Sequence, residues 1–502
     1  MSTEEKLQKM RATYREITQL SGIMALLGWD QQVYMPKAGV EGRANQMALL
    51  GGMIHDKATS EEGGKVIYDL VAEIPDLDAD DDLAREIKLV KKAYDRETKI
   101  PRELVIESAI LGAQAHSAWL EAKQNNDYAT FEPFLKKTVD LNLRIVDFFK
   151  PFDHPYDVLL DTYEPGMKKV EVQAIFDALR PRQVEILQKI AASEQVDDSM
   201  FQKDFPIENQ KRVNAFIAHL MGLPAERTRL DETEHPFTTE FGLDDVRITT
   251  HYHKNQVLSA LMSTIHEGGH ALYQLGLNRA WNETALGQPV SLGVHESQSR
   301  LWENMIARSY PFWEFIYPLM QMEFPSQLEN VSLHQAWRAV NKVAPSFIRT
   351  EADEATYNLH IMLRMELEIA MLDGKLDTRD LPEAWNERMR AYLGVVPPTD
   401  TLGCLQDVHW SGGMLGYFPT YALGNLISAQ WWYKLREDLP NTDDQIRQGK
   451  FAEVLAWLVK NVHHASSRYD TQDLLLRVTG ERLNPDHYVR YLNDKYSKIY
   501  NF

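Results

Sequence analysis

Apolar residues recur at the three- and four-residue spacing of an α-helix along most of the chain, which predicts a mainly helical fold. Residues 1–60 read as long helices, and Pro36 ends or kinks the helical pattern before it. Pro101 suits the first turn of a helix, and a later helix is expected to begin with an N-cap at Thr350 and to stop at Gly374. The other expected helices cover residues 61–74, 83–98, 101–125, 131–149, 170–192, 207–220 and 422 onward.

One stretch departs from helical spacing. Residues 237–241 and 246–252 are rich in β-branched and aromatic residues, and residues 242–245 between them suit a turn. This pattern predicts a hairpin or a small antiparallel sheet. The chain then returns to helical spacing after Asn255, so a helix is expected beside the sheet, whose edge could bind an extended peptide.

The composition narrows the class of protein. The 502 residues include 54 basic and 73 acidic ones, and the formal charge of −19 argues against nucleic acid or an anionic membrane as partner. No apolar run approaches the ~20 residues of a membrane span. The lone cysteine, Cys404, excludes an intramolecular disulfide and fits a reducing compartment. We therefore expect a soluble cytoplasmic protein.

Candidate chemistry lies on the helix after the predicted sheet, which contains the H-E-x-x-H pattern. His266 and His270 are four residues apart and share one helix face, so both rings can reach a single divalent metal, usually zinc. Glu267 is placed to take a proton from water at that metal. Gly268 and Gly269 weaken the helix by about 1 kcal/mol each, which suggests that a packing helix or a substrate backbone comes close.

A catalytic metal needs a third protein ligand and an open position. Glu296, at the start of the next helical pattern, is the candidate, only slightly ahead of Glu303 on residue type alone. The alternative is a solvated glutamate favoured by the helix dipole.

Seven ordered segments, together with the Trp29 region, closely resemble the thermostable carboxypeptidase Taq family of metallocarboxypeptidases. They are His235–Phe237, Asp245–Thr249, His266–His270, His295–Gln298, Ile348–Asp353, Gln406–Trp410 and Gly416–Tyr421. The resemblance implies a mainly α single domain like that of neurolysin and angiotensin-converting enzyme, with a deep central groove and a small antiparallel β-sheet beside the metal helix. Residues 1–230 would form one groove wall, and residues 231–502 the catalytic half.

The same resemblance implies removal of single C-terminal residues from peptides with broad specificity, by a homodimer that uses zinc or cobalt. By the match, the metal ligands are His266, His270 and Glu296, and Glu267 is the general base. Arg349 would hold the substrate carboxylate. His409 and one of Tyr417 or Tyr421 would stabilise the tetrahedral intermediate, through a tyrosine hydroxyl or an imidazolium.

Several of these residues also have structural interpretations. Arg349 could pair with the nearby Glu351 or Asp353, and His409, Tyr417 and Tyr421 could be core residues. His295 is interpreted as a support for the ligands or as substrate-facing, and His235 as a loop residue or a groove-lining group. Arg247 could pair with Asp245 or line the groove. His235, Arg247 and His295 are thus candidate substrate-binding residues.

Two other functions remain open on the sequence. One is an oligopeptidase or dipeptidyl carboxypeptidase with the same metal site. The other is a binding scaffold with a structural metal, although structural zinc sites use four protein ligands, usually with cysteine.

Overall fold

The computed structural model describes residues 1–502 and confirms the mainly helical fold. The first half contains α1 (Thr3–Val33), α2 (Val40–Ala58), α3 (Glu61–Glu73), α4 (Asp82–Lys99), α5 (Arg102–Asn125), α6 (Tyr128–Val146), α7 (Pro155–Leu160), α8 (Lys169–Ala191) and α9 (Ile207–Met221). The second half contains α10 (Val257–Leu275), α11 (Leu292–Arg300), α12 (Tyr310–Glu323), α13 (Pro325–Leu328), α14 (Leu333–Val340), α15 (Glu354–Leu372), α16 (Leu381–Leu393), α17 (Pro419–Asp438), α18 (Thr442–Arg447), α19 (Ala452–Asn461), α20 (Thr471–Thr479) and α21 (Asp486–Tyr500).

Several helix ends follow the local sequence signals. Helix α1 ends at Val33, shortly before Pro36, and Pro101 is the residue before the first turn of α5. The N-cap expected at Thr350 is wrong. Asp353 caps α15 instead, because its carboxylate accepts the N–H groups of Ala355 and Thr356 at 3.0 and 3.1 Å.

The sheet has three strands in the order β1-β3-β2. Strands β2 (Thr238–Glu240) and β3 (Val246–Thr250) pair antiparallel, which confirms the hairpin. The expectation of a purely antiparallel sheet is wrong, because β1 (Thr228–Glu232) pairs parallel with β3. A parallel partner is joined by a crossover rather than a tight turn, so no local pattern announces it.

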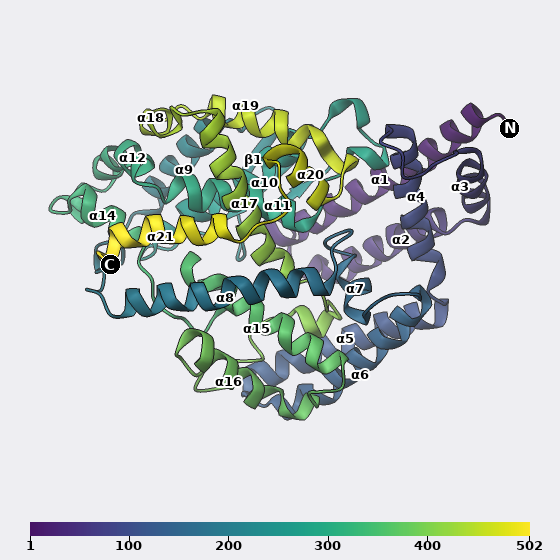
Figure 1. The fold of residues 1–502 in the computed structure, drawn as a ribbon, viewed down its shortest axis with the longest axis horizontal. Coiled ribbons are helices and arrows are strands. Elements are labelled where there is room, and N and C mark those ends of the chain that lie inside the picture. Colours follow the sequence, from purple (N-terminus) through teal and green to yellow (C-terminus); the bar gives the residue numbers. More distant parts are fainter.

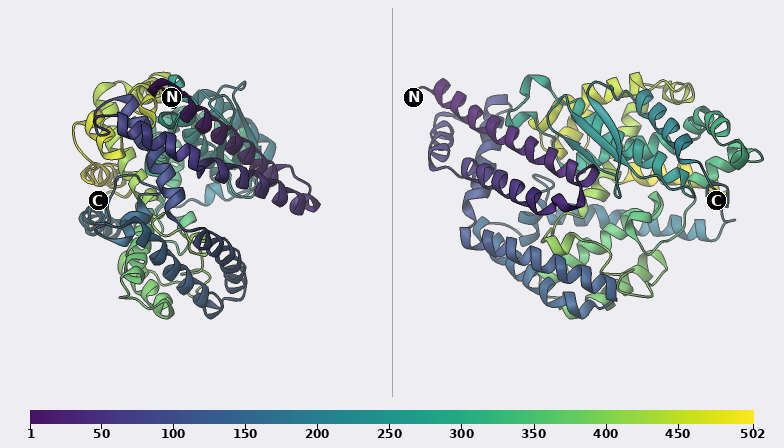
Figure 2. Two further views of the ribbon diagram at one scale, coloured as in Figure 1. Left: turned by 90° about the vertical axis from the view of Figure 1, so that its right-hand side faces the viewer. Right: turned by 180° about the vertical axis from the view of Figure 1, so that it is seen from behind.

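The helices form two groups on either side of α8 (Figure 1). One group contains α10, α11, α17 and the sheet, and the other contains α5, α6, α15 and α16. Figure 2 shows the long helix α1 lying along the outside of the first group. One cluster of 99 buried hydrophobic residues extends through both groups, as expected of a single large domain.

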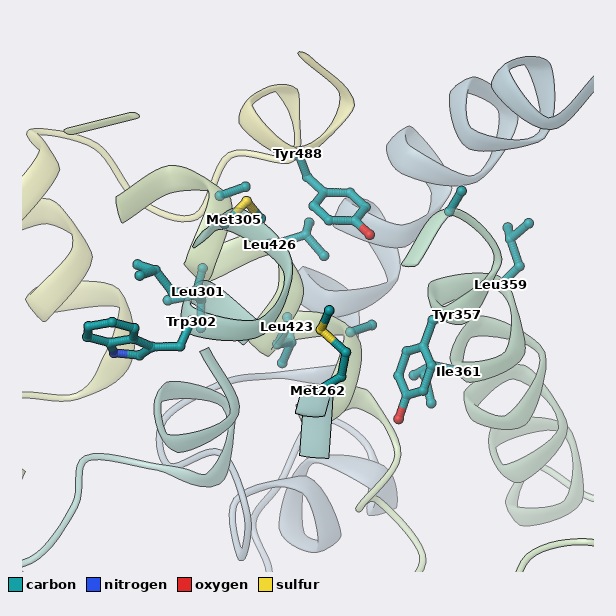
Figure 3. Packing of buried hydrophobic residues seen from close by; sticks show 14 of the residues in the cluster. Met262, Leu301, Trp302, Met305, Tyr357, Leu359, Ile361, Leu423, Leu426 and Tyr488 are labelled. Carbon is teal, nitrogen blue, oxygen red and sulfur yellow. The ribbon is translucent and has the colours of Figure 1, made fainter. Parts of the chain in front are cut away.

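Part of this core lies where the metal helix meets its neighbours. Figure 3 shows Met262 of α10, Leu423 of α17 and Tyr357 of α15 in one packed region. A second, smaller cluster of 8 buried residues holds α1, α3 and α4 together. None of the helices has an apolar stretch long enough to cross a membrane.

Candidate metal centre

Helix α10 carries His266, Glu267 and His270 and packs closely against α11. A Cβ added to Gly269 would lie 2.7 Å from Cα of Ser299 and 2.8 Å from the carbonyl oxygen of Gln298. The close neighbour at Gly269 is therefore a packing helix, whereas Gly268 faces the side chains of Met221 and Leu223. Glycine at position 269 allows α11 to approach the metal helix.

That approach brings the three predicted ligands together. Nε2 of His266 lies 3.7 Å from Oε2 of Glu296, and Nε2 of His270 lies 3.5 Å from the same oxygen. Ligand atoms about 2.0–2.1 Å from a tetrahedral zinc ion lie roughly 3.4 Å apart. The chemistry and spacing of these three groups thus fit a divalent metal with an open position, and the atoms all lie within 4.8 Å of one another.

Each candidate ligand has a partner that orients it. Nδ1 of His266 lies 2.9 Å from Oε2 of Glu303, and Nδ1 of His270 lies 2.5 Å from Nδ1 of His295. Oε1 of Glu296 accepts from Nε of Arg300 at 2.6 Å, which leaves Oε2 to face the histidines. Such partners fix ring orientation and the tautomer that presents Nε2 to a metal.

Glu303 lies on η6 (Leu301–Ala307), a π-helical segment that continues α11. It also accepts hydrogen bonds from Arg300 and Arg308, both at 3.1 Å. The residue that ranked just behind Glu296 as a third ligand is therefore a support for His266.

Glu267 is buried with 7 % of its surface exposed and is held by the sheet. Its Oε2 accepts from the hydroxyl of Thr238 on β2 at 2.6 Å, and the same hydroxyl lies 3.0 Å from the Glu267 carbonyl oxygen. This contact engages Oε2 and fixes the orientation of the carboxylate.

Arg349 lies in a buried charge cluster, at 5 % exposure. It does not pair with Glu351 or Asp353. Instead its Nε and Nη2 donate to Oδ1 of Asp407 at 3.0 and 2.8 Å, and its Nη1 donates to the hydroxyl of Tyr357 at 2.9 Å.

A second cation, Arg364, donates from Nε to Oδ2 of Asp407 at 2.7 Å. Arg364 and Arg349 therefore share one carboxylate, so this group keeps one net positive charge. Such an excess favours binding of an anion.

His409, Tyr417 and Tyr421 lie together beside Arg349. The rings of Tyr417 and Tyr421 are 5.4 Å apart, and the guanidinium of Arg349 lies 4.8 Å from the Tyr421 ring. Burial, reinforced by the Arg349 and Arg364 cations against the opposing effect of Asp407, lowers the pKa of His409 to about 4. His409 is thus neutral near pH 7, so the imidazolium considered from the sequence is not the form present.

The two tyrosine hydroxyls stay protonated. Burial raises the pKa of both, and the nearby Glu296 carboxylate raises it further. The Tyr421 ring lies under the Arg349 guanidinium, and its hydroxyl lies 3.3 Å from Nε2 of His409. The geometry thus associates Tyr421 with the arginine and the histidine.

Two predicted substrate-binding residues lie apart from these contacts. His235 is exposed in the loop between β1 and β2. Arg247 donates to both oxygens of Asp245 at 2.9 and 2.8 Å, and its guanidinium lies 4.3 Å from the Trp29 ring and 4.7 Å from the Phe241 ring. Arg247 thus joins α1 to β3.

A cavity of about 290 Å³ opens beside the metal helix. Its lining includes Met262, Ser263, His266, Glu267, Arg300 and Glu303. This cavity provides space next to the candidate ligands on the side of the general-base candidate.

Sequence reasoning missed the positions that hold the site residues in place. Thr238, Tyr357 and Arg364 carry no local motif, and only the fold brings them to the site. Asp407 could have been found, since it lies in the Gln406–Trp410 segment beside His409.

Comparisons with known proteins agree with this geometry. The family model for carboxypeptidase Taq (M32) metallopeptidases matches residues 9–496. The chain is 39% identical to thermostable carboxypeptidase 1 of Thermus thermophilus over 510 residues, which cover 100% of both chains. It is also 39% identical to carboxypeptidase 1 of Bacillus subtilis over 487 residues, or 97% of each chain.

The fold has close counterparts among solved structures. An M32 carboxypeptidase from Deinococcus radiodurans R1 superposes with a TM-score of 0.96 at 38% identity, covering 99% of this chain and 100% of that one. Metallocarboxypeptidase 1 of Trypanosoma cruzi superposes with a TM-score of 0.93 at 33% identity over 100% of both chains. The chain therefore belongs to the carboxypeptidase Taq (M32) family of metallopeptidases, and it is a metal-dependent carboxypeptidase.

Proposed function

We propose that this carboxypeptidase releases single residues from peptide C-termini with broad side-chain specificity. The observation that carries the proposal is the buried Arg349 guanidinium, which keeps unused donors in the same site as the His266–His270–Glu296 group. A free carboxylate fits the arginine while the scissile bond lies at the three ligand candidates.

The metal would be held by Nε2 of His266, Nε2 of His270 and Oε2 of Glu296. Two imidazoles and one carboxylate suit zinc, and cobalt is the alternative. When bound there, a divalent metal polarises the scissile carbonyl and lowers the pKa of a bound water from about 15.7 toward ~7.

Glu267 would act as the general base. Its carboxylate takes a proton from the attacking water and delivers it to the leaving amine. The Thr238 hydroxyl restrains Oε2 at 2.6 Å, so Oε1 is the oxygen that carries the proton. Fixing this carboxylate lowers the reorganisation required during proton transfer.

Arg349 would hold the terminal carboxylate. A guanidinium has five N–H donors, and three of those of Arg349 are used by Asp407 and Tyr357. One N–H remains on each of Nη1 and Nη2, the pair that binds a carboxylate through two parallel hydrogen bonds. The excess positive charge shared with Arg364 supports the same role.

Tyr417 would stabilise the oxyanion that develops on the substrate, because the neighbouring Tyr421 is already in contact with His409 and Arg349. One such donor typically contributes about 2.7–4 kcal/mol to transition-state stabilisation. His409 would assist as a neutral imidazole, and its Nε2 lies 3.3 Å from the Tyr421 hydroxyl. Tyr421 would then position Arg349 and His409.

His295 would act on substrate through His270 rather than by direct contact, and Arg247 and His235 would serve the outer parts of a groove. A homodimer in the cytoplasm remains part of the proposal. Helix α2 supports the dimer, because it has no buried residue and exposes Val40, Leu49 and Met53.

The test compares one peptide as a free acid and as a C-terminal amide, with products identified by mass spectrometry. The free acid should lose one residue at a time, and the amide should react at least tenfold more slowly. Equal trimming of both peptides would refute the carboxylate model, and dipeptide products would favour a dipeptidyl carboxypeptidase. Glu267→Gln should retain metal and lose turnover, whereas unchanged turnover would remove Glu267 as the base.

A further inference from the structure

Tyr357 lies between the two halves of the site. Its hydroxyl accepts a hydrogen bond from Nη1 of Arg349 at 2.9 Å. Its ring face receives the guanidinium of Arg300, whose central carbon lies 4.6 Å from the ring centroid. Arg300 in turn donates to Oε1 of Glu296 at 2.6 Å. A single tyrosine therefore contacts both the carboxylate-binding arginine and the arginine that orients a ligand candidate.

The tyrosine is held firmly. It lies in the first turn of α15 with 5 % of its surface exposed, and its N–H donates to the carbonyl oxygen of the N-cap Asp353 at 2.9 Å. Figure 3 shows its ring standing off α15 on the side of the core where Met262 lies. A capped, buried first turn leaves the ring few alternative rotamers.

Contacts run without a break from Glu296 through Arg300 and Tyr357 to Arg349. Arg349 is 5 % exposed and Glu296 7 % exposed, so both ends of this series are buried. Close-packed interiors resist small displacements, so the series fixes the separation between Glu296 and the Arg349 guanidinium. Asp407 also holds Arg349, but its hydrogen bonds come from Arg349 and Arg364 and do not connect it to Arg300 or Glu296.

We propose that Tyr357 is a positioning residue that sets how far the scissile bond lies from the terminal carboxylate. This inference rests on the proposed function, in which Arg349 holds that carboxylate and Glu296 lies at the cleavage site. A fixed separation selects the bond one residue from the C-terminus. A looser separation admits the next bond, so dipeptides would be released as well.

Two variants separate the hydroxyl from the ring. Tyr357→Phe keeps the platform for Arg300 and removes the hydrogen bond to Arg349. It should raise KM for free-acid peptides about 10- to 100-fold with a smaller change in kcat. Tyr357→Leu removes both contacts and should release dipeptides along with single residues. Tyr317→Phe is the matched control, since Tyr317 is equally buried and donates to the Val331 carbonyl oxygen at 2.7 Å on distant α12.

A binding measurement adds a readout that is independent of turnover. The affinity of chelator-treated protein for a short free-acid peptide, measured by calorimetry, should fall about tenfold or more in Tyr357→Phe and stay unchanged in Tyr317→Phe. If Tyr357→Leu releases single residues and no dipeptides, the inference is overturned. If that variant does not fold, Tyr357→Phe decides alone, and a KM within threefold of wild type would overturn it.

The wild-type controls separate this inference from the proposed function. If wild type trims free acids and amides equally, the carboxylate model itself fails, and the role given to Tyr357 fails with it. If wild type prefers free acids and the Tyr357 variants behave like wild type, only the role of Tyr357 is refuted.

Discussion

Glu303→Gln is expected to weaken metal binding although Glu303 is not a predicted ligand. The side chain is 8 % exposed and accepts from Nδ1 of His266 at 2.9 Å and from Arg300 and Arg308, both at 3.1 Å. These cations outweigh the opposing effect of burial and hold the pKa of Glu303 well below its usual range. Glutamine keeps the shape of the side chain but removes the negative charge that faces His266.

The size of the effect follows from what the carboxylate does. A partner that orients a metal-binding histidine typically contributes 10- to 100-fold to metal affinity, or about 1.4–2.8 kcal/mol. The substitution also leaves two half-buried arginines, Arg300 and Arg308, without their shared anion. Loss of one charged hydrogen bond lowers the free energy of unfolding by about 1.5–3 kcal/mol. Turnover at saturating metal should fall less than affinity does, because no reacting group is removed.

Competition with a chromophoric chelator measures the affinity, and chemical denaturation measures stability. Glu368→Gln is the matched control, since Glu368 is also a buried glutamate but accepts from Tyr156, Trp410 and Gly416 rather than from a ligand candidate. Metal affinity within twofold of wild type for Glu303→Gln would refute the orienting role. An equal loss in both variants would point to general destabilisation instead.

Three further substitutions test residues in and around the site. Gly424→Ala adds a Cβ that would lie 2.7 Å from both Cβ and Cγ of Glu296, so it should displace this carboxylate and deplete metal, as measured by elemental analysis. Burial raises the pKa of Glu368 from 4.5 to about 7. Its contribution to stability is therefore present below pH 4.5 and lost as the pH rises through 7. As the pH rises from 5 to 8, the free energy of unfolding should fall less in Glu368→Gln than in wild type, by about 3 kcal/mol at most. Denaturant titrations across this pH range measure both, and equal falls in the two proteins would contradict the prediction. Because the pKa of His409 is about 4, His409→Gln should lower kcat without changing the shape of the rate profile between pH 5 and 8; a step near pH 6.5 lost in the variant would contradict it.

Local signals in the sequence predicted most helices because each signal acts within one turn. Pro101 precedes the start of α5 because its ring fixes φ at a helical value. Gly374 lies just beyond the end of α15, where it adopts a positive φ of 66° that other residues disfavour. The sequence predicts the N-cap of α15 at Thr350, three residues before the residue that caps the helix in the structure. Asp353 caps α15 because the hydrogen bonds of a short 3-10 turn hold Thr350 away from the first helical N–H groups.

Strand β1 and the partner of Arg349 depend on contacts between distant residues. The β1 sequence, Thr-Arg-Leu-Asp-Glu, has no alternation, and its parallel partner β3 follows after β2. Arg349 has acidic neighbours in sequence at Glu351 and Asp353, yet it pairs with Asp407. Proximity in sequence is a poor guide to buried ion pairs, because their partners are chosen by the packing of the whole domain.

The spacing of Glu296, Arg300 and Glu303 shows where sequence reasoning could have gone further. Intervals of four and three residues put all three on one face of a continuous helix. The sequence alone could therefore have predicted that Arg300 contacts Glu296, the third ligand candidate. Arg308 lies five residues beyond Glu303, and in an ordinary α-helix a side chain at that interval would point away from the face that carries Glu303. The π-helical segment η6 closes this gap, because its hydrogen bond from Arg308 N–H to the Glu303 carbonyl oxygen at 3.1 Å spans five residues. The wider turn brings a second cation to Glu303, and no periodicity of three or four residues would reveal it.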